Sequence, residues 1–226
     1  MHAILEILRQ TEAAKVMAAA IDYAEYVALD LAVTNTDLAA QSLATAQDYE
    51  HYIQQHLDQH QAKIAFGGYN ETRNLYQRST VFKNENADER NIHIGLDLWM
   101  NEAAPIYAAL DGTIHSFQNN AALGDYGPTI ILQHEIEGHL FHTLYGHLSL
   151  DSLKDKKTGQ AVAKGERIAT LGLPPINGDY APHLHFQIII DMENKQGDYP
   201  GVCSSKTLAH YLRNCPDPNL LLKIKS

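Results

Sequence analysis

The chain of 226 residues contains only two cysteines, Cys203 and Cys215, and a single tryptophan. Two cysteines are too few for a disulfide framework, and these two lack the paired spacing of a thiolate zinc site. We expect two unpaired buried thiols, with one disulfide between them as the alternative. Long apolar runs are also missing, because no stretch approaches the roughly 20 residues that a membrane-spanning helix needs. The sequence therefore excludes an integral membrane protein and predicts no membrane partner.

Basic residues are scarce: Lys and Arg number 17 against 27 Asp and Glu, which gives a net charge of −10. A phosphate backbone repels such a surface, so we expect no nucleic-acid partner. Nine acidic and two basic residues fall within residues 1–61, so most of the excess belongs to the N-terminal segment. The start of the chain lacks the basic region and apolar core of a signal peptide. This predicts a cytoplasmic protein, or a periplasmic or secreted one if the sequence has been trimmed.

The residue pattern of the N-terminal quarter is helical. Good helix formers with a rough apolar stripe predict a helix over 3–26, and alternating apolar residues predict a short strand over 27–33. Asn35 or Thr36 is placed to cap a second helix over 37–62. We place the boundary of this part at Gly67-Gly68.

Beyond that boundary, short β-branched and aromatic runs alternate with Gly, Pro, Asn and Asp. They predict strands at 106–109, 112–118, 129–134, 140–145, 166–171 and 184–190, with a hairpin turn at 135–138 and a short helix at 204–212. No helical pattern separates the strands, so the predicted fold is mainly β. We expect three parts: an N-terminal α-helical extension (1–66), an antiparallel β-sheet or sandwich core (67–195) and a C-terminal tail packed on the core (196–226).

Thirteen histidines are unusual for a chain of this length, and three short motifs carry four of them together with one carboxylate. The motifs are His93-Ile94-Gly95-Leu96-Asp97, Tyr145-Gly146-His147-Leu148 and Pro182-His183-Leu184-His185-Phe186. Residues two apart in a strand point to the same face, so His183 and His185 converge. Two histidines and a carboxylate supply the three ligands of a catalytic zinc, which keeps a fourth position for water. Each motif alone is weak evidence, and the order of all three is far more specific.

In order and spacing, these motifs resemble the lysostaphin-type, LytM-like zinc metallopeptidases. The resemblance covers roughly His93 to Ile190 and implies an all-β metallopeptidase core. It implies that His93, Asp97 and His185 bind Zn²⁺, and that His147 and His183 form the unliganded catalytic pair. The activity it implies is hydrolysis of a peptide or amide bond by metal-activated water.

Further positions resemble one branch of that family, in which this domain is fused to a phosphotransferase and a class III aminotransferase. The segment Tyr69-Asn70-Glu71-Thr72-Arg73 carries this likeness, and it implies that Glu71 and Arg73 line the substrate cleft. A surface ion pair is the alternative for these two residues. Tyr145 is a further candidate for substrate binding.

Other histidines are weaker candidates. His134 precedes Glu135 as in a zincin helix, but the spacing to the next histidine is wrong. His56 and His60 lie four apart on a predicted helix, where a solvated face is the better interpretation, and His142 is a candidate for indirect support of the site.

We expect a zinc-dependent hydrolase acting on a peptide or a small amide, with intact murein a poor substrate and the N-terminal helices available for a homodimer. The alternative is a non-catalytic domain that binds a ligand or regulates a partner through the same cleft. A third interpretation, small-amide hydrolysis or amino-group transfer in metabolism, depends only on the branch resemblance.

Overall fold

A computed structural model of the chain describes residues 2–41, 43–75 and 89–225. Its main feature is an eight-stranded sheet in the order β1-β2-β5-β12-β9-β8-β7-β10, which is antiparallel except for the β1–β2 pair. The strands of this sheet are β1 (Tyr26–Ala28), β2 (Ile64–Gly67), β5 (Leu96–Trp99), β7 (Gly112–Asn120), β8 (Gly127–Ile136), β9 (His139–Gly146), β10 (Ala161–Val162) and β12 (His183–Ile189). The expectation of a mainly β, antiparallel core is confirmed.

Two small sheets flank the large one. One pairs β6 (Pro105–Tyr107) with β11 (Arg167–Thr170), and the other has the order β13-β4-β3. The strands of this second sheet are β3 (Glu71–Thr72), β4 (Ile92–His93) and β13 (Val202–Cys203). Because β4 carries His93 and β3 pairs Glu71 with it, this small sheet helps to build the candidate site.

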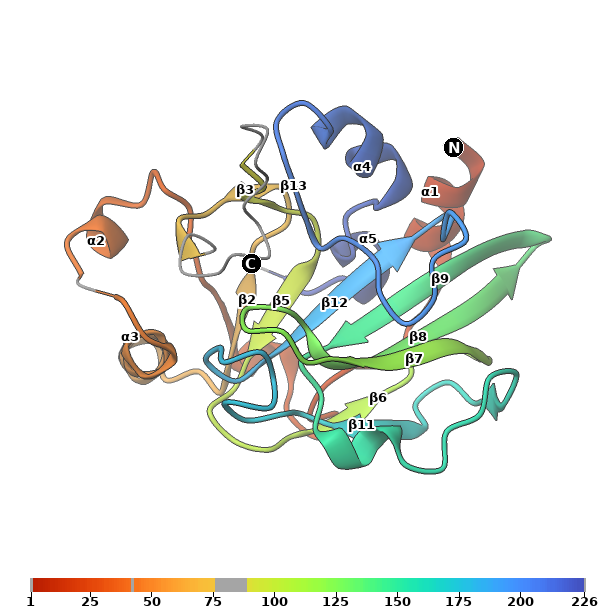
Figure 1. Ribbon diagram of the computed structural model, residues 1–226, viewed down its shortest axis with the longest axis horizontal. Coiled ribbons are helices and arrows are strands. Elements are labelled where there is room, and N and C mark those ends of the chain that lie inside the picture. Colours follow the sequence, from red (N-terminus) through yellow and green to blue (C-terminus); the bar gives the residue numbers. More distant parts are fainter. Residues whose placement is uncertain (1, 42, 76–88, 226) are drawn as a thin grey trace.

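Helices surround the sheets. They are α1 (His2–Gln10), α2 (Thr36–Ala39), α3 (Ala46–His60), α4 (Leu208–Asn214) and α5 (Asn219–Leu222), with 3₁₀ turns η1 (Tyr23–Glu25) and η3 (Leu150–Leu153). Figure 1 shows α2 and α3 on the left, and α1, α4 and α5 at the upper right. Among the described residues, no helix combines the length and the apolar character needed to cross a bilayer.

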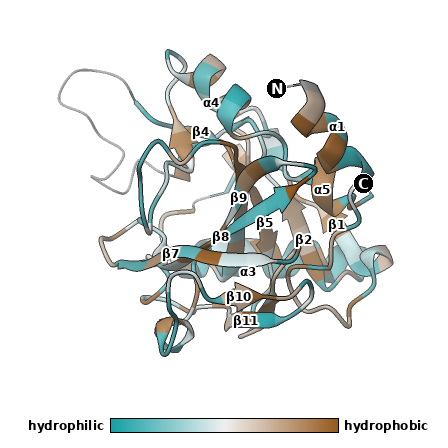
Figure 2. Ribbon diagram, turned by 90° about the vertical axis from the view of Figure 1, so that its right-hand side faces the viewer, coloured by the Kyte–Doolittle hydropathy of each residue, from teal (hydrophilic) through white to brown (hydrophobic). Residues whose placement is uncertain are grey.

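The core lies on both faces of the large sheet. Leu184, Phe186 and Ile188 of β12 point into the larger apolar cluster, which also receives Ile4 and Leu8 of α1. The hydropathy colouring accordingly shows α1 largely brown (Figure 2). The alternate residues of β12 point to the other face of the sheet. His183 and His185 therefore lie side by side on that face, and both are buried.

The N-terminal part differs from the predicted helix over 3–26. Helix α1 ends at Gln10, and the following segment runs along the edge of the core, where Met17 bridges Ile106 and the backbone N–H of Tyr107 donates to the carbonyl of Val16. Burial of Val16 and Met17 in this pairing outweighs the helix propensity of the alanines between residues 13 and 20.

The next predicted elements are shorter than expected. The strand over 27–33 is reduced to β1, and the helix over 37–62 is divided into α2 and α3, with residue 42 outside the described residues. Asn35 caps α2, whereas Thr45 and Asp48 form a capping box that starts α3. Strand β2 lies between β1 and β5 in the main sheet, so the boundary placed at Gly67 falls inside a strand.

The predicted β-rich part is confirmed strand by strand. The hairpin between β8 and β9 turns at Glu137 and Gly138, whose φ angles are 53° and 75°. Two successive positive φ angles make the two-residue turn whose twist matches that of paired strands. In the tail, β13 pairs with β4, and the short helix predicted over 204–212 is observed as α4, which begins at Leu208 and ends at Asn214.

Candidate metal centre

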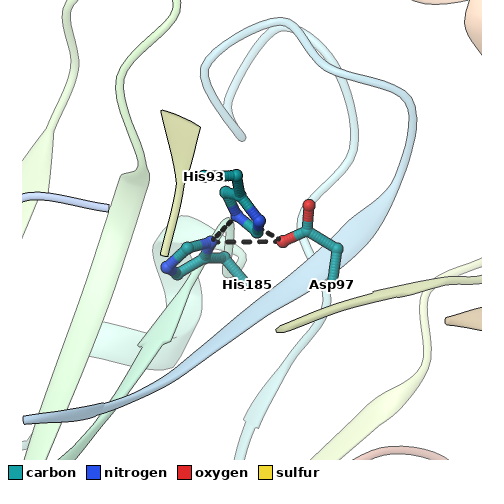
Figure 3. Close-up of side chains that lie close together, drawn as sticks. All are labelled: His93, Asp97 and His185. Atoms are coloured by element: carbon teal, nitrogen blue, oxygen red, sulfur yellow. Dashed lines mark hydrogen bonds and ion pairs between the residues drawn. The ribbon is translucent and has the colours of Figure 1, made fainter. Parts of the chain in front are cut away.

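Three side chains from three different strands converge on one face of the sheet: His93 of β4, Asp97 of β5 and His185 of β12 (Figure 3). The pairing of β12 with β5 brings His185 close to Asp97, since the two residues lie directly opposite each other. Nε2 of His93 lies 2.9 Å from Nδ1 of His185, and Oδ1 of Asp97 lies 3.3 and 3.2 Å from these two nitrogens. All three residues are buried. Gly95 makes room, because a Cβ there would overlap the His185 ring.

The hydrogen bonds of the two imidazoles fix which nitrogen faces the centre. Nδ1–H of His93 donates to the carbonyl of Gly68, at 2.8 Å. Nε2–H of His185 donates to Oε1 of Gln187, also at 2.8 Å, and the amide of Gln187 is oriented by its own donation to the carbonyl of Pro200. A neutral imidazole carries one proton, so the two nitrogens that face each other are both lone-pair acceptors.

Three acceptor atoms with no proton between them repel one another unless a cation lies among them. Ligand atoms at zinc distances in a tetrahedral arrangement stand roughly 3.4 Å apart, close to the spacing of these three atoms. Among the described residues, His93, Asp97 and His185 form the group whose ligand atoms all lie within 4.8 Å of one another. The donor set therefore fits a divalent cation that prefers nitrogen and oxygen ligands.

The protonation states favour the same interpretation. Burial lowers the pKa of His93 to about 4, which keeps its imidazole neutral near pH 7. Burial alone would raise the pKa of Asp97, but its interactions with His93, Arg73 and the other neighbouring imidazoles outweigh burial and hold that pKa well below its ordinary value. Neutral histidines and an ionised carboxylate are the forms that bind metal.

His147 and His183 lie beside this group, with ring centroids 4.2 Å apart. Each donates Nδ1–H to a backbone carbonyl: His147 to Asn177 at 2.7 Å, and His183 to Ala181 at 2.8 Å. Both therefore keep Nε2 as an acceptor, and Nε2 of His183 lies 3.9 Å from Oδ1 of Asp97. Burial is the main cause that lowers the pKa of both imidazoles. The pair is thus neutral and able to accept a proton.

A cleft with an empty volume of about 900 Å³ lies over these five residues. Its walls include apolar residues of the N-terminal segment, Leu31 and Ile53, beside Trp99 of β5. The ring of Trp99 stacks on His183, with centroids 5.9 Å apart. Trp99 is therefore a wall of the cleft.

Glu71 and Arg73 are not a surface ion pair, and that alternative is wrong. The Arg73 side chain is 2% exposed and the Glu71 side chain 11%, and the two are joined by a short hydrogen bond. Arg73 lines the cleft, and its Nη1 donates to Oδ2 of Asp97 at 2.6 Å. Direct contact of Glu71 and Arg73 with a substrate stays a prediction.

Tyr145 requires a correction, because it does not line the cleft. It is fully buried and packs against Phe186 in the larger core cluster, on the opposite face of the sheet from His185. Its hydroxyl accepts hydrogen bonds from the N–H of Ala109 and the hydroxyl of Thr143. Strand pairing gives the reason, since Tyr145 lies opposite Phe186 and shares its face of the sheet. The alternation ends with β9 at Gly146, and His147, with a φ of 60°, turns toward His183 on the other face.

The sequence did not reveal the residues that orient the imidazoles. Gln187 follows His185 at the spacing that places both on one face of β12, so alternation could have found it. The carbonyls of Gly68 and Asn177 carry no side-chain signal and are defined only by the folded backbone. Gly68 adopts a φ of +98°, a conformation that favours glycine.

The remaining candidate residues lie elsewhere. His56 is half-buried and His60 exposed on α3, with ring centroids 4.4 Å apart, and they belong to no metal-binding group within the described ranges. His142 packs against His115 on the far part of β9, away from the cleft. Cys203 and Cys215 are free and buried, which confirms the expected thiols.

Comparison with known proteins finds a family to which the β-rich part is similar. Residues 91–197 match the model of Peptidase family M23, and all five residues of the candidate centre lie within that range. An "Uncharacterized metalloprotease" of Haemophilus influenzae is 36% identical over 99 residues. The matched region covers 44% of this chain and 19% of that protein, so the chain spans under a fifth of its length.

Solved structures give weaker likenesses. The catalytic domain of the antimicrobial peptidase lysostaphin from Staphylococcus simulans is 26% identical with a TM-score of 0.37, over 54% of this chain and 80% of that one. The catalytic domain of the prophage-encoded M23 protein EnpA from Enterococcus faecalis is 20% identical with the same TM-score, over 51% and 81%. At these TM-scores the structural likeness carries no conclusion. The family match and the metalloprotease relative show that residues 91–197 of this chain are similar to Peptidase family M23.

Proposed function

We propose that the chain is a zinc-dependent hydrolase that cleaves a peptide or amide bond. The observation that carries the proposal is the convergence of three unprotonated ligand atoms, on His93, Asp97 and His185, beside two further neutral imidazoles. The match to a peptidase family supports the peptidase half of the proposal. Nitrogen and carboxylate ligands in a three-residue set support zinc, which is commonly held by such sets in catalytic sites.

The five residues of the centre have two roles, which follow from their positions. His93, Asp97 and His185 would hold the ion, which when bound supplies the Lewis acidity that activates water and polarises a carbonyl. His147 and His183 stand ready to accept a proton through Nε2, because their Nδ1 atoms are occupied by backbone carbonyls. One neutral imidazole can take a proton from water, and the other, once protonated, can stabilise an oxyanion or protonate the leaving amine.

For the substrate we propose a small peptide or amide. The apolar wall that Leu31, Ile53 and Trp99 give the cleft supports a substrate with an apolar group near the scissile bond. The acidic N-terminal segment supports a substrate other than an anionic cell wall. The cytoplasmic location, the homodimer through the N-terminal helices and the link to a fused phosphotransferase and aminotransferase stay predictions.

The test combines metal analysis with hydrolysis of a library of internally quenched peptides and of dye-labelled murein. We expect about one zinc per chain, release of fluorescence from peptides, loss of that activity after chelation and its return with zinc. The double variant His147→Ala/His183→Ala is the control for contaminating peptidases. Metal without hydrolysis of any substrate would instead favour the non-catalytic binding domain, and strong murein release would favour a cell-wall substrate.

A further inference from the structure

The carboxylate of Asp97 is divided between two environments. Its Oδ1 faces His93 and His185, as described above, whereas its Oδ2 accepts a hydrogen bond from Nη1 of Arg73 at 2.6 Å. The side chains of Arg73 and Asp97 are 2% and 1% exposed, so water does not screen their interaction. A charge-assisted hydrogen bond of this length is among the stronger ones in proteins. Arg73 therefore fixes one oxygen of Asp97 and, through it, the plane of the carboxylate.

Arg73 is itself held in place by a second carboxylate. Its Nε donates to Oε2 of Glu71 in a short hydrogen bond, and Oε1 of Glu71 accepts the backbone N–H of Leu31 at 3.1 Å. The buried guanidinium thus lies between two carboxylates, which compensate its charge. A continuous series of hydrogen bonds leads from Leu31 of the N-terminal segment to the carboxylate of Asp97.

The space around the guanidinium is also defined. A Cβ on Gly68 would overlap the end of the Arg73 side chain, and the carbonyl of the same glycine orients His93. The guanidinium carbon lies 5.6 Å from the centroid of the Trp99 ring on another side. Gly68 is therefore in contact with both Arg73 and a candidate metal ligand, His93.

We propose that Arg73 is a positioning residue of the metal centre, which holds Oδ2 of Asp97 so that only Oδ1 is presented to the ion. A carboxylate free to rotate can offer both oxygens to a cation, and the second oxygen would take the position that a catalytic zinc keeps for water. Partners that hydrogen-bond the ligands of a metal set its affinity and coordination. Arg73 and Glu71 precede residues 91–197, so a segment outside the family match completes the centre.

The inference depends on the metal centre of the proposed function and not on its substrate. The decisive variant is Arg73→Lys, which keeps the buried positive charge but removes the planar fork. We expect zinc affinity, measured by competition with a chromophoric chelator, to fall about 10–100-fold. We also expect the visible absorption of the Co²⁺-loaded variant to weaken, because four-coordinate cobalt gives way to higher coordination. Affinity within twofold of the parent, with an unchanged cobalt spectrum, would overturn the inference.

Arg90→Gln is the matched control, because Arg90 lines the same cleft but its charge acts on Asp125 and Asp198. It should leave zinc affinity and the cobalt spectrum unchanged, and equal losses in both arginine variants would also overturn the inference. If Arg73→Lys does not fold by circular dichroism, Glu71→Gln replaces it. This variant should weaken zinc binding several-fold, and an unchanged affinity contradicts the inference.

The outcomes separate this inference from the proposed function. A parent protein that binds no zinc would overturn both. A parent that binds zinc as tightly as Arg73→Lys does would overturn the positioning role alone. A parent that binds zinc more tightly than the variant but hydrolyses no peptide would support the positioning role and overturn the peptidase activity.

Discussion

Nε2 of His93 and Nδ1 of His185 lie 2.9 Å apart, although 92 positions separate the two residues in the chain. Each ring uses its other nitrogen as a donor, to Gly68 and to Gln187, so the two facing nitrogens are both acceptors. With Oδ1 of Asp97 as a third acceptor, this arrangement is stable only with positive charge at its centre.

Removal of the carboxylate should remove the metal. We expect Asp97→Ala to retain less than a tenth of the zinc of the parent after dialysis, since two neutral imidazoles without a charged ligand hold a catalytic zinc poorly. Metal analysis by atomic emission measures this directly. Full zinc occupancy in the folded variant would show that Asp97 is not a ligand.

Removal of the unliganded imidazoles should spare the metal. His147→Ala and His183→Ala should keep zinc but lose about 10²–10⁴-fold in peptide hydrolysis, because these groups act on protons and developing charge. Initial rates and zinc content are measured on the same samples. If either variant lost zinc as fully as His185→Ala, that histidine would have to be counted among the ligands.

The amide that orients His185 should matter for metal affinity. Gln187→Leu removes the acceptor of the Nε2–H bond without changing the chain fold of β12. We expect zinc affinity to fall about 10–100-fold. Gln133→Leu on β8 is the matched control and should leave affinity unchanged, and an equal result for the two variants would rule out a specific role for Gln187.

The pH dependence of stability should reveal a buried histidine away from the cleft. Burial lowers the pKa of His142 to about 4, from an ordinary value of 6.5. As the pH falls, His142 is therefore protonated in the unfolded chain before it is protonated in the folded one. The contribution of neutral His142 to the free energy of unfolding is present in full above pH 6.5 and is lost as the pH falls toward 4.

The measurement is urea unfolding of the metal-free protein at pH 7 and at pH 4.5. We expect His142→Gln to lose less stability over this interval than the parent, by on the order of 2 kcal/mol. His139→Gln, an exposed position on the same strand, should behave as the parent does. A parent and a His142→Gln variant with the same pH dependence would contradict the assignment.

The β-rich half of the fold could be predicted because its signals are local. Short β-branched runs define β7, β8, β9 and β12, and the Glu137-Gly138 turn defines the hairpin between two of them. The N-terminal part could not be predicted in the same way, because burial of Val16 and Met17 against β6 overrides the helix propensity of neighbouring alanines.

The same difference between local signals and long-range packing applies to the candidate centre. His183 and His185 share a face by alternation alone, so the sequence predicts that they converge. Tyr145 obeys the same alternation and therefore faces the core, which the motif resemblance did not reveal. The place of Arg73 behind Asp97 depends on the pairing of β3 with β4 and of β5 with β12, and no local pattern contains that information.

The most direct test of the central claim is anomalous diffraction at the zinc absorption edge from crystals of the zinc-loaded protein. We predict one strong peak per chain, within about 2.0–2.2 Å of Nε2 of His93, Oδ1 of Asp97 and Nδ1 of His185. Oδ2 of Asp97 should remain bonded to Arg73 and away from the ion. A structure of the zinc-loaded protein with no peak between these three atoms, or with zinc held at other residues, would contradict the account.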